Sequence, residues 1–428
     1  MKYTEELIVI FSVSFLLLSN CKENLTKINT LETIDIESNI DNFKELKLSQ
    51  INADIIYVPL KSDENHPLSR IDHIDATSDM LLVSNTDICF IFDYNGNIIR
   101  KISEKGRGPD EYSAIINSCF GFNENLFIQN IDDFMEYKVD GTLKGSFSIK
   151  AGKDPLFYMM SWIPINDSLF LGQVPLPRTG NGEIKAIIFD NQGITRYEFK
   201  NYIFLDRPQT GFSTSEDSYA TFFRYRNRLY FKEQMNDTLF SLTDNFYLHP
   251  EIRFNIGKYS KPKKYRQGNT DGGYNPANFV SLRNIYETHD FLFIDCDFGF
   301  HTPAKRITPV EFMGIEQWYN TQNVLGLYDK ANKSLSFCKP TSTDNPLFTT
   351  GIYNDIDAGP RFYPFEQIND STMVMIVEAN QLKDHVDSDD FKNTLVLYPE
   401  KKSKLKRLVD SIDEFDNPIL MFVILHDE

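Results

Sequence analysis

Short apolar runs alternate with short polar turns along most of the chain, and the runs come in pairs. In the first pair, residues 70–76 are followed by the polar turn Thr77-Ser78-Asp79 and then by Met80-Leu81-Leu82-Val83. Five further pairs have the same order, at 114–122 and 126–129, 158–164 and 169–172, 220–225 and 229–232, 279–286 and 291–294, and 362–368 and 372–376. Runs of this length between turn-forming residues predict antiparallel β-strands.

A hairpin signal follows most of these pairs. Phe92-Asp93-Tyr94-Asn95-Gly96 leads into a strand at 97–102, and Asp140-Gly141 marks a second hairpin of the same kind. Further copies lie at 189–193 and 328–332, and a weaker one at 242–245. A single hairpin cannot bury its own apolar face, so the recurrence indicates a repeat architecture in which many hairpins stack.

Together these signals describe a unit of four short antiparallel strands, here called A to D, that occurs six times. Such a series predicts an all-β fold, a six-bladed β-propeller of four-stranded antiparallel blades. Two β-sandwiches would also contain short strands and polar turns. Six consecutive copies of one strand order favour the propeller.

The sixth unit departs from the others. After Val377 the segments 379–392 and 401–412 have helical periodicity, and a strand at 419–425 then supplies strand C without a following strand D. Near the other end of the chain, residues 55–60 form a lone apolar strand. We expect this strand to complete the last blade, because a sheet made from both chain ends leaves no open edge in the ring.

The first residues are expected to be a signal and not part of the fold. Residues 7–18 are apolar, too short to cross a bilayer as a helix, and they end at Leu18-Ser19-Asn20-Cys21, which resembles a bacterial lipobox. Asn20 and the acidic Glu5 and Glu6 depart from the usual pattern, and an ordinary secretory signal is the alternative. The expected division is a lipoprotein signal peptide at 1–20, a polar tether at 21–50 and the propeller at 51–428, with lipidation at Cys21.

Composition limits the function classes. The net charge of −17 argues against nucleic acid as a partner, because phosphate binding needs a basic surface. The remaining cysteines are expected to be small buried hydrophobic residues, although spacing alone does not exclude a disulfide (Cys89, Cys119, Cys296 and Cys338). The seven histidines are scattered, no nucleophile elbow is present, and no cofactor or metal is indicated.

Several stretches carry a resemblance to a known family. They are Ile56-Tyr57-Val58-Pro59-Leu60, Phe92-Asp93 to Gly96 with the loop at 106–112 that follows it, Asn354-Asp355-Ile356-Asp357-Ala358-Gly359, and Asp416-Asn417-Pro418-Ile419-Leu420. The chain resembles the six-bladed β-propeller lipoproteins of Bacteroidetes, which are related to NHL-type propellers; Asp110 stands where that family has a third glycine. The resemblance implies export and attachment to the outer membrane, periplasmic or surface-exposed. It implies no established activity.

Strand parity indicates where a site would lie. Successive strands of a blade run in opposite directions, so the A–B and C–D turns lie on one face of a propeller. The B–C loops, and the crossings from strand D to strand A of the next blade, lie on the other face. The long segments all belong to the second class, namely 174–185, 259–278, 298–322, 341–361 and 379–417. Because binding residues concentrate on loops held by a rigid scaffold, we expect ligand-binding residues on that loop-rich face (Arg107, Asp110, Glu111, Tyr112, Tyr274, Arg306, Trp318, Asn354, Asp355, Asp357 and Arg361).

Structural roles compete with a binding role for two of these groups. Residues 106–112 also suit a turn between blades, with Tyr112 packed against a blade, and 354–357 suits an Asx turn, with calcium binding as its functional alternative. Arginine and aromatic side chains suit a carbohydrate or peptide ligand. The leading hypothesis is a membrane-anchored binding or scaffold module. The alternatives are a glycan-active lyase or hydrolase that uses Asp110, Glu111 and Asp357, and a structural subunit of a surface complex.

Overall fold

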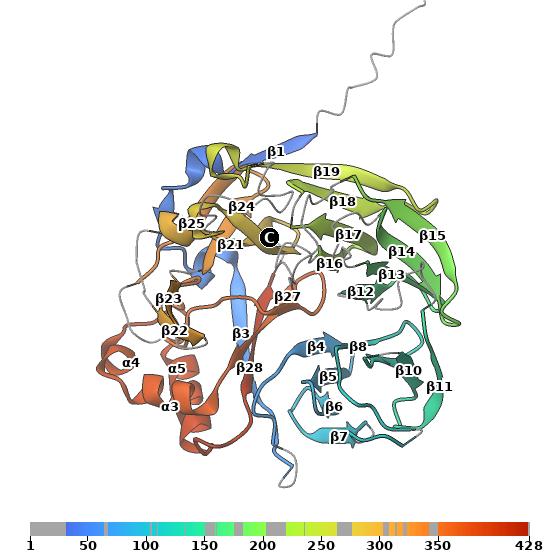
Figure 1. Cartoon of the computed structure of the whole chain (residues 1–428). Coiled ribbons are helices and arrows are strands. Elements are labelled where there is room, and N and C mark those ends of the chain that lie inside the picture. Colours follow the sequence, from blue (N-terminus) through green and yellow to red (C-terminus); the bar gives the residue numbers. More distant parts are fainter. Residues whose placement is uncertain are drawn as a thin grey trace, which may run out of the picture.

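Six antiparallel sheets stand around a common axis, each with its first strand nearest the centre and its last strand at the rim (Figure 1). The protein is therefore a six-bladed β-propeller, as the repeat pattern predicts. The computed structural model describes residues 31–63, 67–102, 105–108, 110–131, 133–149, 159, 161–174, 183–202, 220–234, 236–262, 276–302, 308–312, 315–319, 323–341 and 350–426.

The first three blades follow one another without added elements. Blade one is β4 (His73–Ala76), β5 (Met80–Ser84), β6 (Cys89–Asp93) and β7 (Ile98–Lys101). Blade two is β8 (Asn117–Phe120), β9 (Leu126–Gln129), β10 (Phe134–Tyr137) and β11 (Leu143–Phe147). Blade three is β12 (Trp162–Pro164), β13 (Leu169–Gln173), β14 (Ile184–Asp190) and β15 (Thr195–Lys200).

The last three blades each include a segment from near the N-terminus. Blade four is β16 (Ala220–Tyr225), β17 (Arg228–Glu233), β18 (Thr238–Leu242) and β19 (Leu248–Asn255), with β1 (Glu32–Asp35) at its rim. Blade five is β20 (Ser281–Glu287), β21 (Phe291–Asp297), β24 (Asn323–Asp329) and β25 (Ser334–Cys338), with β2 (Phe43–Lys44) at its rim. Blade six is β26 (Glu366–Gln367), β27 (Thr372–Val377), β28 (Ile419–Leu425) and β3 (Ala53–Pro59).

The core lies between neighbouring blades. Successive side chains of a strand point to opposite faces of its sheet, so each strand contributes to the two interfaces on either side of its blade. In β5, Leu81 and Val83 pack towards blade six, whereas Leu82 between them packs against Leu126 and Ile128 of blade two. Both faces of a middle strand are thus apolar and buried. The rim strands have only one buried face or none, so β7 and β11 are largely exposed.

The two ends of the described chain close the ring, as expected from the sequence. β28 pairs with β27 on one side and with β3 on the other, and Phe422 lies opposite Ile56 in the second ladder. Neither β28 nor β3 shows an irregularity in register. The lone strand near the N-terminus is therefore strand D of the last blade.

The expectation of a polar tether at 21–50 is wrong for residues 32–50, because this part of the chain packs against the propeller. β1 pairs in parallel with β19, β2 pairs in parallel with β25, and Ile34, Ile36 and Ile40 are buried between them and the blades. The short helices η1 (Glu37–Asn39) and η2 (Leu48–Ile51) connect these strands. We call residues 32–52 the strap. The buried isoleucines of the strap are spaced among many polar residues. The average composition of the segment is therefore polar, and composition alone indicates a tether.

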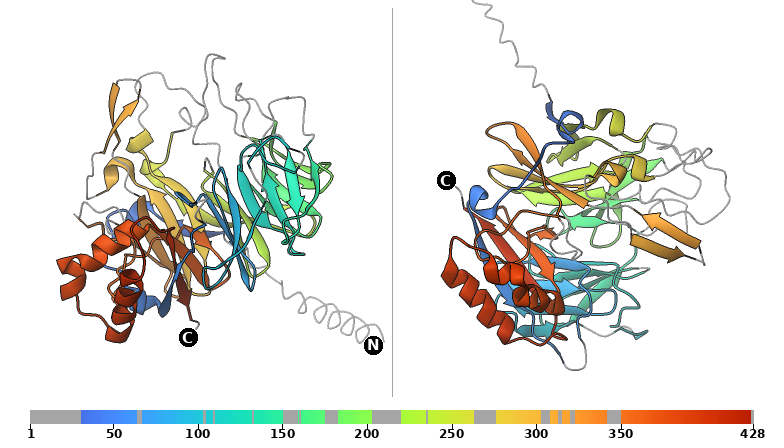
Figure 2. Two further views of the ribbon diagram at one scale, coloured as in Figure 1. Left: turned by 90° about the horizontal axis from the view of Figure 1, so that it is seen from below. Right: turned by 90° about the vertical axis from the view of Figure 1, so that its left-hand side faces the viewer.

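Two insertions interrupt the strand repeat. Between β27 and β28 lie α3 (Ala379–Asp387), α4 (Asp389–Asn393) and α5 (Pro399–Asp410), which pack at the outer side of blade six (Figures 1 and 2). Between β21 and β24 the hairpin of β22 (Thr308–Phe312) and β23 (Ile315–Tyr319) projects away from the ring (Figure 2). Three further short helices are η4 (Gly257–Tyr259), η5 (Pro276–Asn278) and η6 (Gly299–His301).

Candidate functional site

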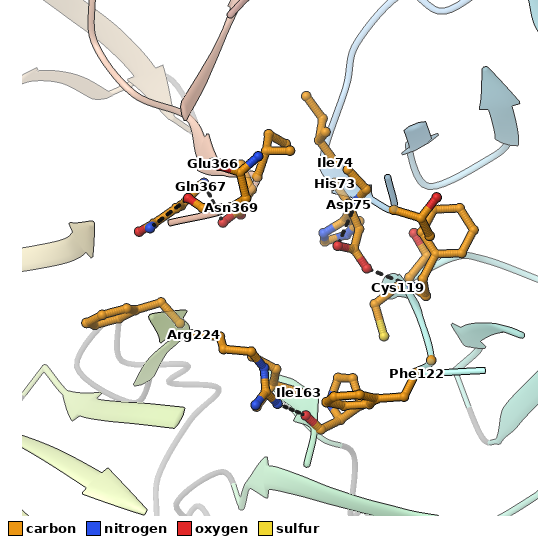
Figure 3. Close-up of a pocket in the computed structure, with 18 of the residues that line it drawn as sticks. His73, Ile74, Asp75, Cys119, Phe122, Ile163, Arg224, Glu366, Gln367 and Asn369 are labelled. Atoms are coloured by element: carbon orange, nitrogen blue, oxygen red, sulfur yellow. Dashed lines mark hydrogen bonds between the residues drawn. The ribbon is translucent and has the colours of Figure 1, made fainter. Parts of the chain in front are cut away.

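A pocket of about 680 Å³ lies on the propeller axis. Its lining comes from the innermost strands β4, β8, β12, β16 and β26 and from the A–B turns that follow them (Figure 3). Because those turns share one face of the disc, the pocket belongs to that face and not to the loop-rich face. Its lining combines carboxyl, guanidinium, imidazole, amide and aromatic groups (His73, Asp75, Asn117, Cys119, Phe122, Trp162, Phe223, Arg224, Asn227, Glu366, Gln367, Asn369 and Asp370).

Asp75 is a carboxyl group on β4 that links two blades at the pocket wall. Its Oδ2 accepts a hydrogen bond from the Phe120 amide of blade two at 2.7 Å, and its Oδ1 accepts one from the Ala76 amide at 2.8 Å. Burial raises the pKa of Asp75 to about 6, because desolvation outweighs the two amide donors. Asp75 therefore changes charge near neutral pH.

Glu366 is a second carboxyl group, on the short strand β26 of the adjacent blade six. Its Oε1 accepts a hydrogen bond from the Gln367 amide at 3.0 Å. The Gln367 side chain in turn donates to the Glu287 carbonyl at 2.7 Å and accepts from the Glu287 amide at 2.9 Å, which ties β26 to blade five. Burial, and then the charge of Asp75, raise the pKa of Glu366 to about 7.

Arg224 places a guanidinium group on the side of the pocket away from these acids (Figure 3). It donates to the Pro164 carbonyl at 2.7 Å and to the Asn227 carbonyl at 3.4 Å, and it lies 4.9 Å from the centre of the Phe122 ring. Burial lowers the pKa of Arg224. Phe122 is 52% exposed, so an aromatic surface stands open at this wall.

Two more groups in the pocket lining have shifted pKa values. Burial lowers the pKa of His73 and raises the pKa of the Cys119 thiol well above its usual range, so both groups favour their neutral forms. Cys89, Cys296 and Cys338 are buried free thiols, as expected for small hydrophobic residues. Within the described part of the chain, no group of three or more His, Cys, Asp or Glu side chains is arranged to hold a metal ion.

The expected site residues Arg107, Asp110, Glu111 and Tyr112 lie in a turn between blades one and two. The Glu111 carboxylate accepts a hydrogen bond from the Gly108 amide at 2.7 Å, and the Gly106 amide donates to the Tyr112 carbonyl at 2.9 Å. Tyr112 is buried and its hydroxyl donates to the Asp87 carbonyl at 3.3 Å. Arg107 and Asp110 are exposed, and the Asp110 carbonyl accepts from the Tyr137 hydroxyl. This is the inter-blade turn that the sequence offered as the structural alternative.

The expected residues at 354–357 form an internal Asx turn. Asn354 Oδ1 accepts from the amides of Ile356 and Asp357, both at 3.2 Å, and the Asn354 amide donates to Asp357 at 2.7 Å. The Tyr57 hydroxyl donates to the same Asp357 carboxylate at 3.2 Å. Burial raises the pKa of Asp357. The turn therefore joins the last blade crossing to the closing strand β3.

Asp355 and Arg361 hold the strap. Asp355 accepts hydrogen bonds from the amide and hydroxyl of Ser49, at 3.1 and 2.6 Å. Arg361 pairs with Glu45 at 2.7 Å and lies over the Tyr353 ring. Both side chains thus make contacts within the fold. These contacts have no signal in the sequence, because the partners Ser49 and Glu45 lie about 300 positions away.

Three expected residues remain. Trp318 is on β23 opposite Pro309, and Tyr274 and Arg306 lie outside the described residues. None of the expected site residues in the described ranges lines the pocket. Sequence reasoning missed Asp75, Arg224 and Glu366. The available signal was the presence of charged residues inside the innermost strands, where an apolar residue would be usual.

Comparison with known proteins shows the family. The chain belongs to the family described as a domain of unknown function (DUF4934), whose model matches residues 31–424. No curated protein matches the chain. The match begins at the strap, in agreement with the inclusion of residues 32–51 in the fold.

Two solved structures from Bacteroides species are similar to this chain. A Bacteroides fragilis protein described as exported is similar, with a TM-score of 0.65 and 15% identity, over 93% of this chain and 100% of that one. A member of the DUF4221 family from Bacteroides vulgatus has a TM-score of 0.45 and 12% identity, over 67% of this chain and 86% of that one. At 15% identity the likeness to the Bacteroides fragilis protein shows the fold alone, and it agrees with the six-bladed propeller expected from the sequence. In the ranges that the structure describes, no helix is long and apolar enough to span a membrane.

Proposed function

We propose that this chain is an exported ligand-binding module and that the central pocket is its binding site. The observation that carries the proposal is the convergence of charged, amide and aromatic side chains from five blades on one cavity of about 680 Å³. Cavities of about 300–1,000 Å³ with a few converging polar groups are typical of small-ligand sites. The rigid ring of blades holds these groups in place before a ligand arrives, which lowers the entropy cost of binding.

The ligand class is a carbohydrate or a peptide. Asp75 and Glu366 accept or donate hydrogen bonds according to pH, and Arg224 offers further N–H donors. Phe122, at 52% exposure, offers a ring face to an apolar side chain or a sugar ring. A short oligosaccharide or peptide has the size and the mixture of polar and apolar surface to fit.

The proposed location is the outer membrane, through a lipid on Cys21. The apolar run at 7–18 and the sequence Leu18-Ser19-Asn20-Cys21 support this, as does the structural likeness to a protein described as exported. Labelling cells with a palmitate analogue tests it. We expect incorporation into the wild-type chain and none into Cys21→Ser; equal labelling of both would contradict lipidation.

A ligand screen with a filled pocket tests the binding proposal. Ile163 lines the pocket, and Ile163→Trp fills part of it; Phe415→Ser, a change of an aromatic that is 85% exposed beyond α5, is the matched control. Thermal-shift screening against oligosaccharide and peptide panels should find ligands that stabilise the wild type and the control but not Ile163→Trp. Ligands that stabilise all three equally would reject the pocket as the site.

A further inference from the structure

The pocket has two walls of opposite charge. Asp75 of blade one and Glu366 of blade six stand on adjacent blades, and Arg224 of blade four stands across the axis from them (Figure 3). A ligand that fills the cavity would therefore touch both signs of charge at once. This arrangement rests on the ring order of the blades and not on neighbouring sequence, because Asp75 and Glu366 are nearly 300 positions apart.

Within the described residues, neither wall is paired with a side chain of opposite charge. The hydrogen bonds described for Asp75 and Glu366 come from backbone amides, and neither carboxylate forms an ion pair within the described residues. Arg224 donates to backbone carbonyls, and no carboxylate pairs with it in the same part of the chain. Charges that are partly removed from water without a counter-charge are unfavourable. Each wall would be stabilised by a ligand group of opposite charge.

The titration behaviour agrees with this picture. Burial raises the pKa values of Asp75 and Glu366 to about 6 and 7, and it lowers the pKa of Arg224. A ligand ammonium group beside Asp75 and Glu366 would lower their pKa values again, and a ligand carboxylate beside Arg224 would raise the pKa of the guanidinium again. Beside Arg224, the half-exposed Phe122 ring offers apolar surface to a ligand side chain.

We propose that the central pocket binds a short peptide with free termini, with its ammonium group against Asp75 and Glu366 and its carboxylate against Arg224. The inference rests on the proposed function and narrows its ligand class. A cavity of about 680 Å³ exceeds the needs of a single amino acid and suits two or three residues. Arginine is well suited to the carboxylate end, because its planar N–H donors match a carboxylate in pairs.

The test measures binding of an equimolar library of unblocked tripeptides at pH 7.5 by native mass spectrometry of the mature chain. The same library is supplied N-acetylated, and again C-amidated. We expect each modification to lower the bound fraction at least tenfold. Arg224→Gln should bind C-amidated and unblocked peptides equally and still bind N-acetylated peptides more weakly. Glu366→Gln should reduce the difference between N-acetylated and unblocked peptides and leave the effect of C-amidation unchanged. Arg100→Gln, an exposed change on the rim strand β7, is the matched control.

The outcomes separate this inference from the proposed function. Equal binding of blocked and unblocked peptides would overturn the charge-based orientation. Binding of a neutral oligosaccharide that Ile163→Trp abolishes, with no peptide bound, would overturn the peptide inference and leave the pocket as a ligand site. If neither class binds in a way that Ile163→Trp affects, both proposals fail. Thermal unfolding of each variant shows whether it is folded before it is scored.

Discussion

The Asp75 carboxylate accepts a hydrogen bond from the Phe120 amide of the neighbouring blade at 2.7 Å. An acid at the wall of the pocket is thus also a link between two blades. Its two oxygens serve two backbone amides, those of Ala76 and Phe120. The pocket and the ring that carries it therefore share an anchoring group.

We predict that Asp75→Ala destabilises the protein more than Asp75→Asn. Alanine leaves both amides without an acceptor, at a cost of about 1–3 kcal/mol, whereas asparagine keeps one carbonyl oxygen for the Phe120 amide. Urea unfolding at pH 5, where the carboxyl group is mostly neutral, measures the difference without the cost of a buried charge. Equal destabilisation by the two changes would show that the inter-blade hydrogen bond has no energetic role.

Glu366 should make stability depend on pH. Its folded pKa of about 7 lies above the ordinary value of 4.5, so the stability associated with the neutral group is fully present below pH 4.5 and is lost as the pH rises through 7. Relative to that of Glu366→Gln, the free energy of unfolding of the wild type should fall by up to about 3 kcal/mol between pH 4.5 and 8. Urea unfolding at both pH values measures this, with the exposed Glu414→Gln as control. If the difference in free energy of unfolding between the wild type and Glu366→Gln is constant with pH, the raised pKa of Glu366 is contradicted.

The hairpin turn of the first blade should tolerate no side chain at Gly96. Gly96 has φ +79°, and a Cβ there would lie 2.0 Å from the Pro59 carbonyl oxygen of the closing strand. We expect Gly96→Ala to cost about 2 kcal/mol or more. Gly145→Ala, where an added Cβ meets nothing within 4 Å, should be neutral. Thermal unfolding of the two variants gives the comparison, and similar losses would place the turn away from β3.

The strap should contribute to stability in proportion to its buried side chains. Ile34, Ile36, Ile40 and Leu48 are each at most 4% exposed, and burial of such a side chain is worth about 1.5–3 kcal/mol. A chain that begins at residue 53 should therefore unfold at a markedly lower temperature than one that begins at residue 31. A chain that begins at residue 63 lacks β3 as well and should not form a closed ring. Equal unfolding temperatures for the first two chains would reject the structural role of the strap.

The sequence predicts the fold well because the fold is built from local signals repeated six times. Turn residues such as Asn95-Gly96 and the alternation of apolar residues in β5 recur in register, and closure by β3 follows from counting strands. The strap was not predicted, because Ile34, Ile36 and Ile40 are isolated among polar residues and their partners are blades formed some 200 to 300 residues later.

The candidate site could not be predicted in the same way. Asp75 and Glu366 are single charged residues inside strands, and only the geometry of the ring brings them to one cavity with Arg224. The loops at 106–112 and 354–361 are conspicuous in sequence because they contain glycine, proline and acidic residues. In the described structure those residues make turns and hold the strap.

A crystal structure of the mature chain with a ligand found in the thermal-shift screen tests the central claim most directly. We predict ligand density on the propeller axis, in the cavity between Glu366 and Arg224 and in contact with Phe122. Density on the loop-rich face, with the axial pocket holding only water, would contradict the account.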